Sequence, residues 1–229
     1  MANQQPLVSV IVAVKNGERY LASALTSIFS QDYQAFEVIV VDDGSIDATQ
    51  AIANSFPGVS LIQEAGNGVA NARNVGIDAA NGEFIAFLSH DDLWTINKLS
   101  TQVNYLLQHS EIQYTIAKIK FFLEPGYSIP PTFKPQLLSQ EPVGYIPETL
   151  VAKKSLFAAI GKFDTSLSVA EDVDWFSRAS DYQITKAIIP QVLLYKRIHD
   201  ANTSLTSQIS DQNLLRVMRR SIKRKQNYV

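Results

Sequence analysis

The sequence contains no cysteine, which excludes disulfide bonds and thiolate metal sites and suits a reducing compartment. Long hydrophobic runs are also missing. The first apolar stretch, residues 7–14, is eight residues long and includes Ser9, whereas a membrane-spanning helix needs about 20 apolar residues. Residues 1–6 are polar, so we expect no signal peptide. A cytoplasmic protein is the expectation.

The chain also lacks an excess of charge of one sign. It has 20 Lys and Arg against 22 Asp and Glu, a formal net charge of -2, so no overall field draws it to nucleic acid, and we expect no nucleic-acid partner. With 229 residues, 46% of them hydrophobic, it can bury a sizeable core. We predict one domain over residues 1–205 and a basic, helical tail over residues 206–229.

Short apolar runs rich in β-branched residues alternate with runs of helical spacing in the first half. The sequence predicts strands at residues 7–14, 36–41, 59–62 and 84–88, and helices starting near residues 20, 47 and 69. Repeated strand-helix-strand units at this spacing favour an α/β fold. We expect a Rossmann-like, mostly parallel central sheet with helices on both faces.

Polar pairs follow three of these predicted strands. They are Lys15 and Asn16, Asp42 and Asp43, and Asp91 and Asp92. The carboxyl ends of parallel strands share one edge of the sheet, where ligands bind in such folds. We therefore expect the three pairs to meet at one binding edge, although a turn with a helix cap explains Asp42 and Asp43 nearly as well.

The second half is less regular. We predict helices at residues 98–108, 153–160, 172–179 and 211–225, a strand at 112–122, one or two strands within 184–195, and a polar loop at 197–204. Residues 124–147 hold six prolines and show little periodicity. Long loops of this kind are often functional lids.

Five motifs in this order resemble glycosyltransferase family 2, and together they are far more specific than any one of them. They are Val-Ser-Val-Ile-Val-Ala-Val-Lys-Asn-Gly-Glu at 8–18, Val-Val-Asp-Asp-Gly-Ser at 40–45, Ala-Asn-Ala-Arg-Asn-Val-Gly at 70–76, Gly-Glu-Phe-Ile-Ala-Phe-Leu at 82–88, and Gly-Lys-Phe-Asp-Thr-Ser-Leu at 161–167 with Ala-Glu-Asp-Val-Asp-Trp at 170–175. The match covers about residues 6–204. The resemblance implies a GT-A fold, a nucleotide-sugar donor, a divalent metal and an inverting transfer.

The resemblance also implies roles for single residues. It places the donor nucleotide, with a UDP-linked sugar as the expectation, against Val14, Asn16, Asp43, Arg73, Ser89 and His90. Asp172 matches the general base, and Glu171 and Trp175 would lie on the acceptor side. Acids in the first turn of a helix are favoured by its dipole in any case, and Arg73 without this context is nearly as well explained as an exposed or capping residue.

Metal binding is the point at which the sequence departs from the family pattern. Asp91 matches the last acid of the metal-binding Asp-X-Asp motif, but Ser89 replaces the first. His199 matches a histidine near the metal and diphosphate. Carboxylates can hold Mg²⁺ or Mn²⁺ against the charge that develops on a diphosphate leaving group. With one acid fewer, we expect weaker metal binding, with Asp92 available beside Asp91.

The sequence therefore supports two functions of different class. The first is a glycosyltransferase that acts on a saccharide or lipid-linked acceptor in cell-surface polysaccharide or glycoconjugate synthesis. The second is a degenerate, non-catalytic relative that binds a nucleotide or a partner protein, which Ser89 favours. The basic residues 216–225 either form a solvated face or meet anionic lipid at the inner face of the membrane.

Overall fold

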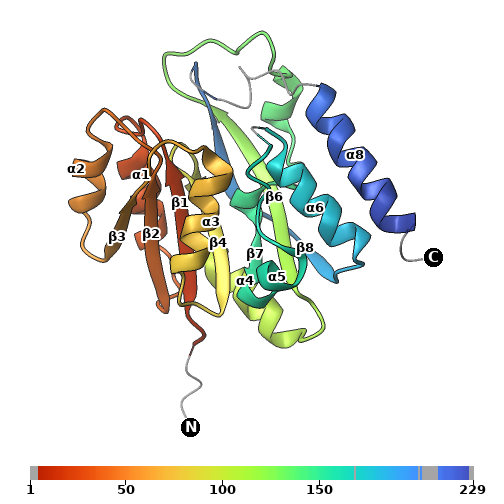
Figure 1. Cartoon of the computed structure of the whole chain (residues 1–229). Helices are drawn as coiled ribbons and strands as arrows, with labels where there is room; N and C mark the ends of the chain where they lie inside the picture. Colours follow the sequence, from red (N-terminus) through yellow and green to blue (C-terminus); the bar gives the residue numbers. More distant parts are fainter. Residues whose placement is uncertain (1–4, 168, 201, 203–210, 227–229) are drawn as a thin grey trace.

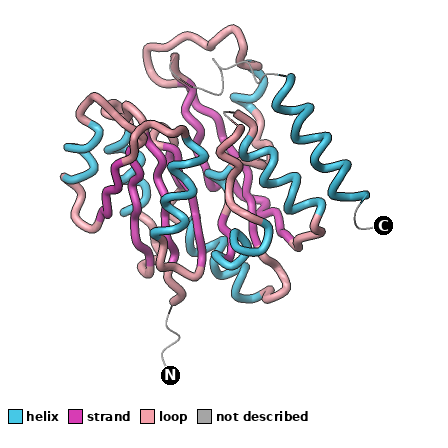
Figure 2. The backbone as a smooth tube through the Cα atoms, in the orientation of Figure 1, coloured by secondary structure: helices cyan, strands magenta, loops and turns pink. Residues whose placement is uncertain are grey.

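An eight-stranded sheet runs through the centre of the molecule, in the order β3-β2-β1-β4-β7-β6-β8-β5 (Figure 1, Figure 2). The structure is a computed structural model, and it describes residues 5–167, 169–200, 202 and 211–226. The strands are β1 (Val8–Val14), β2 (Phe36–Asp42), β3 (Val59–Gln63), β4 (Phe84–Ser89), β5 (Leu93–Trp94), β6 (Tyr114–Leu123), β7 (Val151–Lys153) and β8 (Lys186–Ile198).

The first four strands are parallel to one another, and they form the half of the sheet that the sequence predicts most clearly. β1 pairs with β2 and β4, and β2 pairs with β3, all parallel. Their runs of Val and Ile suit strands that are covered on both faces. β7 joins this half to the rest through antiparallel pairs with β4 and β6, whereas β6 and β8 are parallel. The predicted α/β class with a mostly parallel sheet is confirmed.

Helices cover both faces of the sheet, as expected. One face packs against α1 (Leu21–Phe29), α2 (Thr49–Asn54) and α4 (Lys98–Gln108), and the other against α3 (Val69–Ala79), α5 (Lys154–Ile160) and α6 (Glu171–Asp181). Val10 and Val12 of β1 point to the first face and Ile11 to the second, which is the alternation that a strand imposes. Two large apolar cores result, one on each side, and Ala117, Ile189 and Leu193 form a smaller buried cluster.

Two boundaries differ from those predicted. The sequence predicts a helix from residue 153, but Val151–Lys153 forms β7 and α5 begins at Lys154; three residues are too few to show a period. The predicted loop at residues 197–204 begins later, because β8 runs on to Ile198. Arg197 is charged, yet it is buried near the end of β8. A charged residue there interrupts the apolar pattern from which a strand is predicted.

The proline-rich segment is mostly loop, as predicted, with 3-10 turns at η1 (Pro135–Ser139) and η2 (Pro147–Thr149). The last helix, α8 (Asp211–Gln226), lies along α6 (Figure 1). Val217 of α8 is buried, and Arg224 Nε lies 2.8 Å from Asp181 Oδ2. No helix in the described part of the chain is long and apolar enough to cross a bilayer.

Candidate active site

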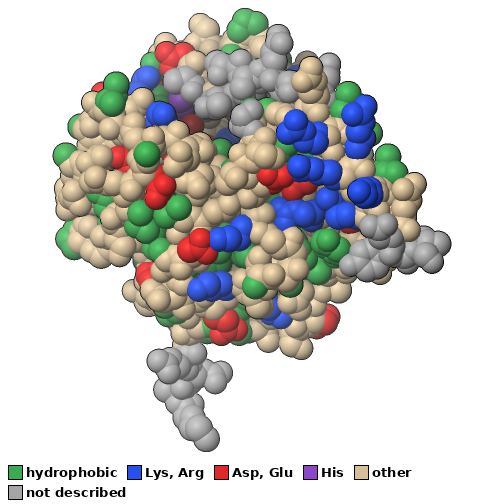
Figure 3. Space-filling model, in the orientation of Figure 1, with side chains coloured by type: hydrophobic (Ala, Val, Ile, Leu, Met, Phe, Trp, Pro, Cys, Tyr) green, Lys and Arg blue, Asp and Glu red, His purple; other side chains and the backbone are tan. Residues whose placement is uncertain are grey.

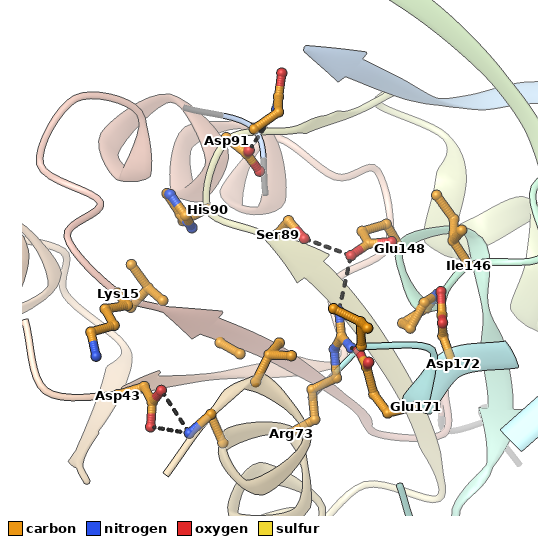
Figure 4. Close-up of a pocket in the computed structure, with 18 of the residues that line it drawn as sticks. Lys15, Asp43, Arg73, Ser89, His90, Asp91, Ile146, Glu148, Glu171 and Asp172 are labelled. Carbon is orange, nitrogen blue, oxygen red and sulfur yellow. Dashed lines mark hydrogen bonds and ion pairs between the residues drawn. The ribbon is translucent and has the colours of Figure 1, made fainter. Parts of the chain in front are cut away.

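A cavity of about 540 Å³ lies at the carboxyl ends of β1, β2 and β4, and one residue of each predicted polar pair lines it, namely Lys15, Asp43 and Asp91 (Figure 4). Its other walls come from η2, the start of α6 and the end of β8. The lining residues are Ala13, Val14, Lys15, Asp43, Gly66, Gly68, Val69, Ala72, Arg73, Ser89, His90, Asp91, Ile146, Pro147, Glu148, Val169, Ala170, Glu171, Asp172, Lys196 and Asn202.

One end of the cavity is built around Asp43. Its carboxylate accepts hydrogen bonds from the backbone N–H of Gly68 at 3.0 and 3.2 Å, and Gly68 has a φ of 93° that suits glycine. The preceding Asp42 is fully buried and accepts the backbone N–H of Ser45. Asp42 is therefore structural, and Asp43 is the acid that faces the cavity.

Asn16 does not line the cavity, in contrast to the role predicted for it. Its side-chain oxygen accepts the backbone N–H of Ile46, and its own N–H donates to Ser45 Oγ. A φ of 52° turns its backbone out of the strand direction. Asn16 ties the loop after β1 to the loop after β2, so it supports the nucleotide end without facing it.

The middle of the cavity holds a buried charge network. Arg73 Nη1 lies 2.6 Å from Glu171 Oε1, and Arg73 Nη2 lies 3.3 Å from Glu148 Oε1. Ser89 Oγ donates to the same Glu148 oxygen at 2.5 Å (Figure 4). Burial raises the pKa of Glu148, but Lys196, Arg73 and the Ser89 hydroxyl outweigh it and leave that pKa lowered. Glu148 is therefore ionised at neutral pH.

This network changes the interpretation of two predicted residues. The guanidinium of Arg73 was expected to reach nucleotide or phosphate oxygens, but it is held between two carboxylates, so its first task is to balance their charge. Glu148 was missed by sequence reasoning. It follows Pro147 in an aperiodic segment, and only a folded chain shows that this acid reaches Ser89.

Asp172 lies on the opposite wall from Asp43 and Lys15 (Figure 4). Ala170, with a φ of 71°, turns the chain into α6 just before it. Burial and the neighbouring Glu171 carboxylate raise the pKa of Asp172 to about 6, against a smaller opposing effect of Arg73. A carboxylate with a pKa this close to neutrality is suited to accept a proton.

Trp175 is not on the acceptor side of the cavity, which corrects the prediction. Its side chain is fully buried and packs among aromatic rings of the core, namely Tyr114, Phe157, Phe163 and Phe176. Its place on α6 faces the sheet, while Asp172 stands at the first turn of the helix, at the cavity. Glu171 does line the cavity, but its carboxylate is paired with Arg73.

Asp91 and His199 come together as predicted. His199 Nε2 and Asn202 Nδ2 both lie 3.2 Å from Asp91 Oδ2. Burial raises the pKa of Asp91, but the His199 hydrogen bond and the charge of Lys196 overcome this and lower that pKa. Asp92 is not available beside it, because its side chain is fully buried and accepts Lys196 Nζ at 2.8 Å.

These residues fit a divalent metal only in part. Within the described ranges, no group of three or more His, Asp or Glu side chains is placed to hold an ion. Mg²⁺ often binds through one or two carboxylates together with substrate phosphates. Asp91 therefore fits such an ion as a carboxylate that lines the cavity, while His199, which is 3% exposed, lies behind it with Nε2 against Asp91 Oδ2.

The Ser89 hydrogen bond generates a first prediction. Ser89→Asp puts a second carboxylate against buried Glu148, so we expect the free energy of unfolding to fall by about 3 kcal/mol or more. Ser89→Ala loses only one hydrogen bond and should cost about 1 kcal/mol. The double variant Ser89→Asp with Glu148→Gln should recover most of the loss. Urea unfolding measures all three, and equal stability of Ser89→Asp and Ser89→Ala would contradict the geometry.

The pKa of Asp172 generates a second prediction. An unfolded Asp has a pKa of about 3.9, so between about pH 4 and pH 6 the folded state keeps a proton that the unfolded state has lost, and stability falls as the pH rises. Asp172→Asn lacks this loss. The free energy of unfolding of this variant, relative to that of wild type, should therefore rise by about 3 kcal/mol between about pH 4 and pH 8. Urea unfolding at both pH values tests this, and a constant difference would refute it.

The profile of Glycosyl transferase family 2 matches residues 9–159. An uncharacterized glycosyltransferase of Rickettsia typhi is 34% identical over 218 residues, which cover 88% of this chain and 67% of the relative. The UDP-Glc:alpha-D-GlcNAc-diphosphoundecaprenol beta-1,3-glucosyltransferase WfgD of Escherichia coli is 36% identical over 107 residues, 45% of this chain and 42% of WfgD.

Solved structures show the same fold. S. aureus TarS in complex with UDP-GlcNAc has a TM-score of 0.76 at 23% identity, over 95% of this chain and 66% of that one. The mannosyltransferase PcManGT of Pyrobaculum calidifontis, in complex with GDP-Man and Mn²⁺, has a TM-score of 0.72 at 21% identity, over 96% and 65%. This chain thus spans less than two thirds of either solved chain. Its fold is the GT-A fold, and the chain belongs to glycosyl transferase family 2.

Proposed function

We propose that this protein is an inverting glycosyltransferase that moves a sugar from a nucleotide-diphosphate sugar to an acceptor hydroxyl. The observation that carries the proposal is the position of Asp172, a carboxylate with a raised pKa across the cavity from Asp43. One end of the cavity suits a nucleotide base and the other suits proton removal. The space between them accommodates a diphosphate and a sugar.

The assigned roles follow from these positions. Asp43 accepts hydrogen bonds from the edge of the base. The nucleotide is bordered by Val14, Ser89 and His90. Arg73 sets the charge of the cavity near the sugar. The acceptor oxygen bonds to the anomeric carbon and gives its proton to Asp172. The bond from that carbon to the diphosphate breaks, and its electron pair leaves with the diphosphate. Attack from the face opposite the leaving group inverts the configuration.

A divalent metal, Mg²⁺ or Mn²⁺, would be held by Asp91 and His199 together with the diphosphate. When bound, it would supply positive charge to the leaving group. The complex of PcManGT with Mn²⁺ is in keeping with this role. The WfgD name, with its UDP-Glc donor and lipid-diphosphate acceptor, supports a UDP-linked donor, a saccharide or lipid-linked acceptor and a place in cell-surface polysaccharide synthesis.

The alternative is a non-catalytic relative that binds a nucleotide, and Ser89 is the observation that favours it. A panel of UDP- and GDP-sugars with Mn²⁺ separates the two functions. Turnover of any donor supports the enzyme. Stabilisation by UDP or GDP, with no donor hydrolysed or transferred, supports the binding protein instead.

Asp172→Asn gives the third prediction. It should lower transfer by about 10²- to 10⁴-fold, because no carboxylate then takes the acceptor proton. The affinity for the nucleoside diphosphate should stay close to wild type. Asp78→Asn, on the exposed side of α3, serves as the control and should transfer at the wild-type rate. Loss of nucleotide binding in Asp172→Asn would show that the residue belongs to the donor site.

We also propose that the tail, residues 206–229, contacts the inner face of a membrane through the outer side of α8. On the inner side, Arg220 and Arg224 pair with Asp164 and Asp181. On the outer side, Leu215, Met218 and Ile222 are 47–59% exposed, beside the exposed cations Arg216, Arg219 and Lys223. Figure 3 shows Lys and Arg gathered where α8 lies. An apolar stripe flanked by cations suits an anionic bilayer surface.

Charge reversal on this outer side gives the fourth prediction. Each cation near an anionic surface contributes about 1 kcal/mol, so the variant Arg216→Glu, Arg219→Glu, Lys223→Glu should bind phosphatidylglycerol vesicles at least about ten-fold more weakly in co-sedimentation. Lys134→Glu, at an exposed site in the proline-rich segment, serves as the control for a single charge reversal elsewhere on the surface and should bind the vesicles like wild type. Equal sedimentation of the triple variant and wild type would exclude this surface.

A further inference from the structure

Lys196 is a charged residue of the cavity that the proposed roles do not use. It lies near the end of β8, and its side chain is 18% exposed. Nζ is anchored 2.8 Å from Asp92 Oδ2, and the other oxygen of Asp92 accepts the backbone N–H of Arg197 at 3.0 Å. Asp92 itself is fully buried. The ammonium is therefore fixed by Asp92, and Lys196 is one of the residues that line the cavity.

Three acids surround this ammonium. Burial lowers the pKa of Lys196, but the carboxylates of Asp92, Glu148 and Asp91 together outweigh it and raise that pKa above its usual value. Lys196 therefore carries its charge at any pH at which the protein works. Lys196 lies where acids that follow β4 and an acid of η2 come together, and their negative charge favours a cation there.

The other cations of the cavity are less suited to a diphosphate. Lys15 stands with Asp43 at the nucleotide end (Figure 4). Both Nη atoms of Arg73 donate to carboxylates, whereas Nζ of Lys196, which carries three protons, donates to Asp92 Oδ2. Lys196 shares its wall with Asp91. The proposed metal site has only two protein ligands, Asp91 and His199, because Ser89 supplies no carboxylate. Few metal ligands are thus placed to balance the charge of the leaving group. A lysine is present beside them.

We propose that Lys196 binds the diphosphate of the donor directly, so that part of nucleotide binding does not depend on a metal. The inference rests on the proposed function, since it assumes a nucleoside diphosphate in this cavity. An ammonium close to the leaving oxygens stabilises the negative charge that develops on them. It is already in place before the donor binds, so no reorganisation is needed.

A purely structural role for Lys196 would be to neutralise Asp92. The two roles are separated by replacing Asp92 as well as Lys196. Lys196→Met alone leaves a buried, unpaired carboxylate and is expected to unfold easily. The double variant Asp92→Asn, Lys196→Met carries neither charge. Its matched control is Asp92→Asn, which keeps the ammonium and loses only the anchor.

The experiment is calorimetric binding of UDP and GDP, each against its nucleoside, uridine or guanosine, in EDTA and in Mn²⁺. In EDTA, wild type and Asp92→Asn should bind the diphosphate more tightly than the nucleoside. Asp92→Asn, Lys196→Met should lose about ten-fold or more of diphosphate affinity, with nucleoside affinity unchanged. The nucleoside serves as the test that the cavity is folded, and Lys196→Arg should restore the preference.

Two results would overturn the inference. One is equal diphosphate affinity in EDTA for Asp92→Asn and for the double variant. The other is a wild type that prefers the diphosphate only when Mn²⁺ is present, a result that leaves the proposed function standing. If wild type binds neither UDP nor GDP even with Mn²⁺, the proposed donor site fails, and the inference fails with it.

Discussion

The ion pairs of Arg73 are the interaction on which the cavity depends. Arg73 belongs to α3, in the first half of the chain, while Glu148 and Glu171 belong to the second half. All three side chains are buried, so the loss of any one would leave an unbalanced charge in a medium that solvates it poorly. The network ties the two halves of the chain together between the Asp43 end of the cavity and the Asp172 end. The distance across the cavity is set by electrostatics as well as by packing.

Much of the first half could be predicted, because its strands are runs of β-branched residues and its polar pairs follow them directly. Asp43, Ser89 and Asp91 meet at one edge, as parallel strands require. Family resemblance, and not periodicity, singled out Asp172 and His199. The prediction was wrong for Trp175, since a tryptophan three residues after a pair of acids gives no sign of which side of the helix it occupies. Glu148 has no local signal, because its partners are 59 and 75 residues away in the chain.

Ser89 has a different meaning in the folded protein from that in the sequence. In the sequence motif, Ser89 stands where the family has a carboxylate. In the structure its hydroxyl donates to Glu148, so the negative charge near the end of β4 comes from another segment and is shared with Arg73. Asp92 is likewise withdrawn into the interior by Lys196. The local charge is thus redistributed among protein groups, and Asp91, hydrogen-bonded to His199 and Asn202, is the acid after β4 that lines the cavity.

The burial of Trp175 has a consequence for how such a protein changes its acceptor. The wall that carries Asp172 is anchored in the aromatic core one turn further along α6, so its shape is tied to the stability of the whole domain. The lining residues Ile146 and Pro147 come from a segment of loops and short turns, and Ile146 lies on the same side of the cavity as Asp172 (Figure 4). Under the proposed function, substitutions there would change the fit of an acceptor while Asp172 keeps its place on α6. Chemistry and selectivity would then be carried by parts of the chain that can diverge independently.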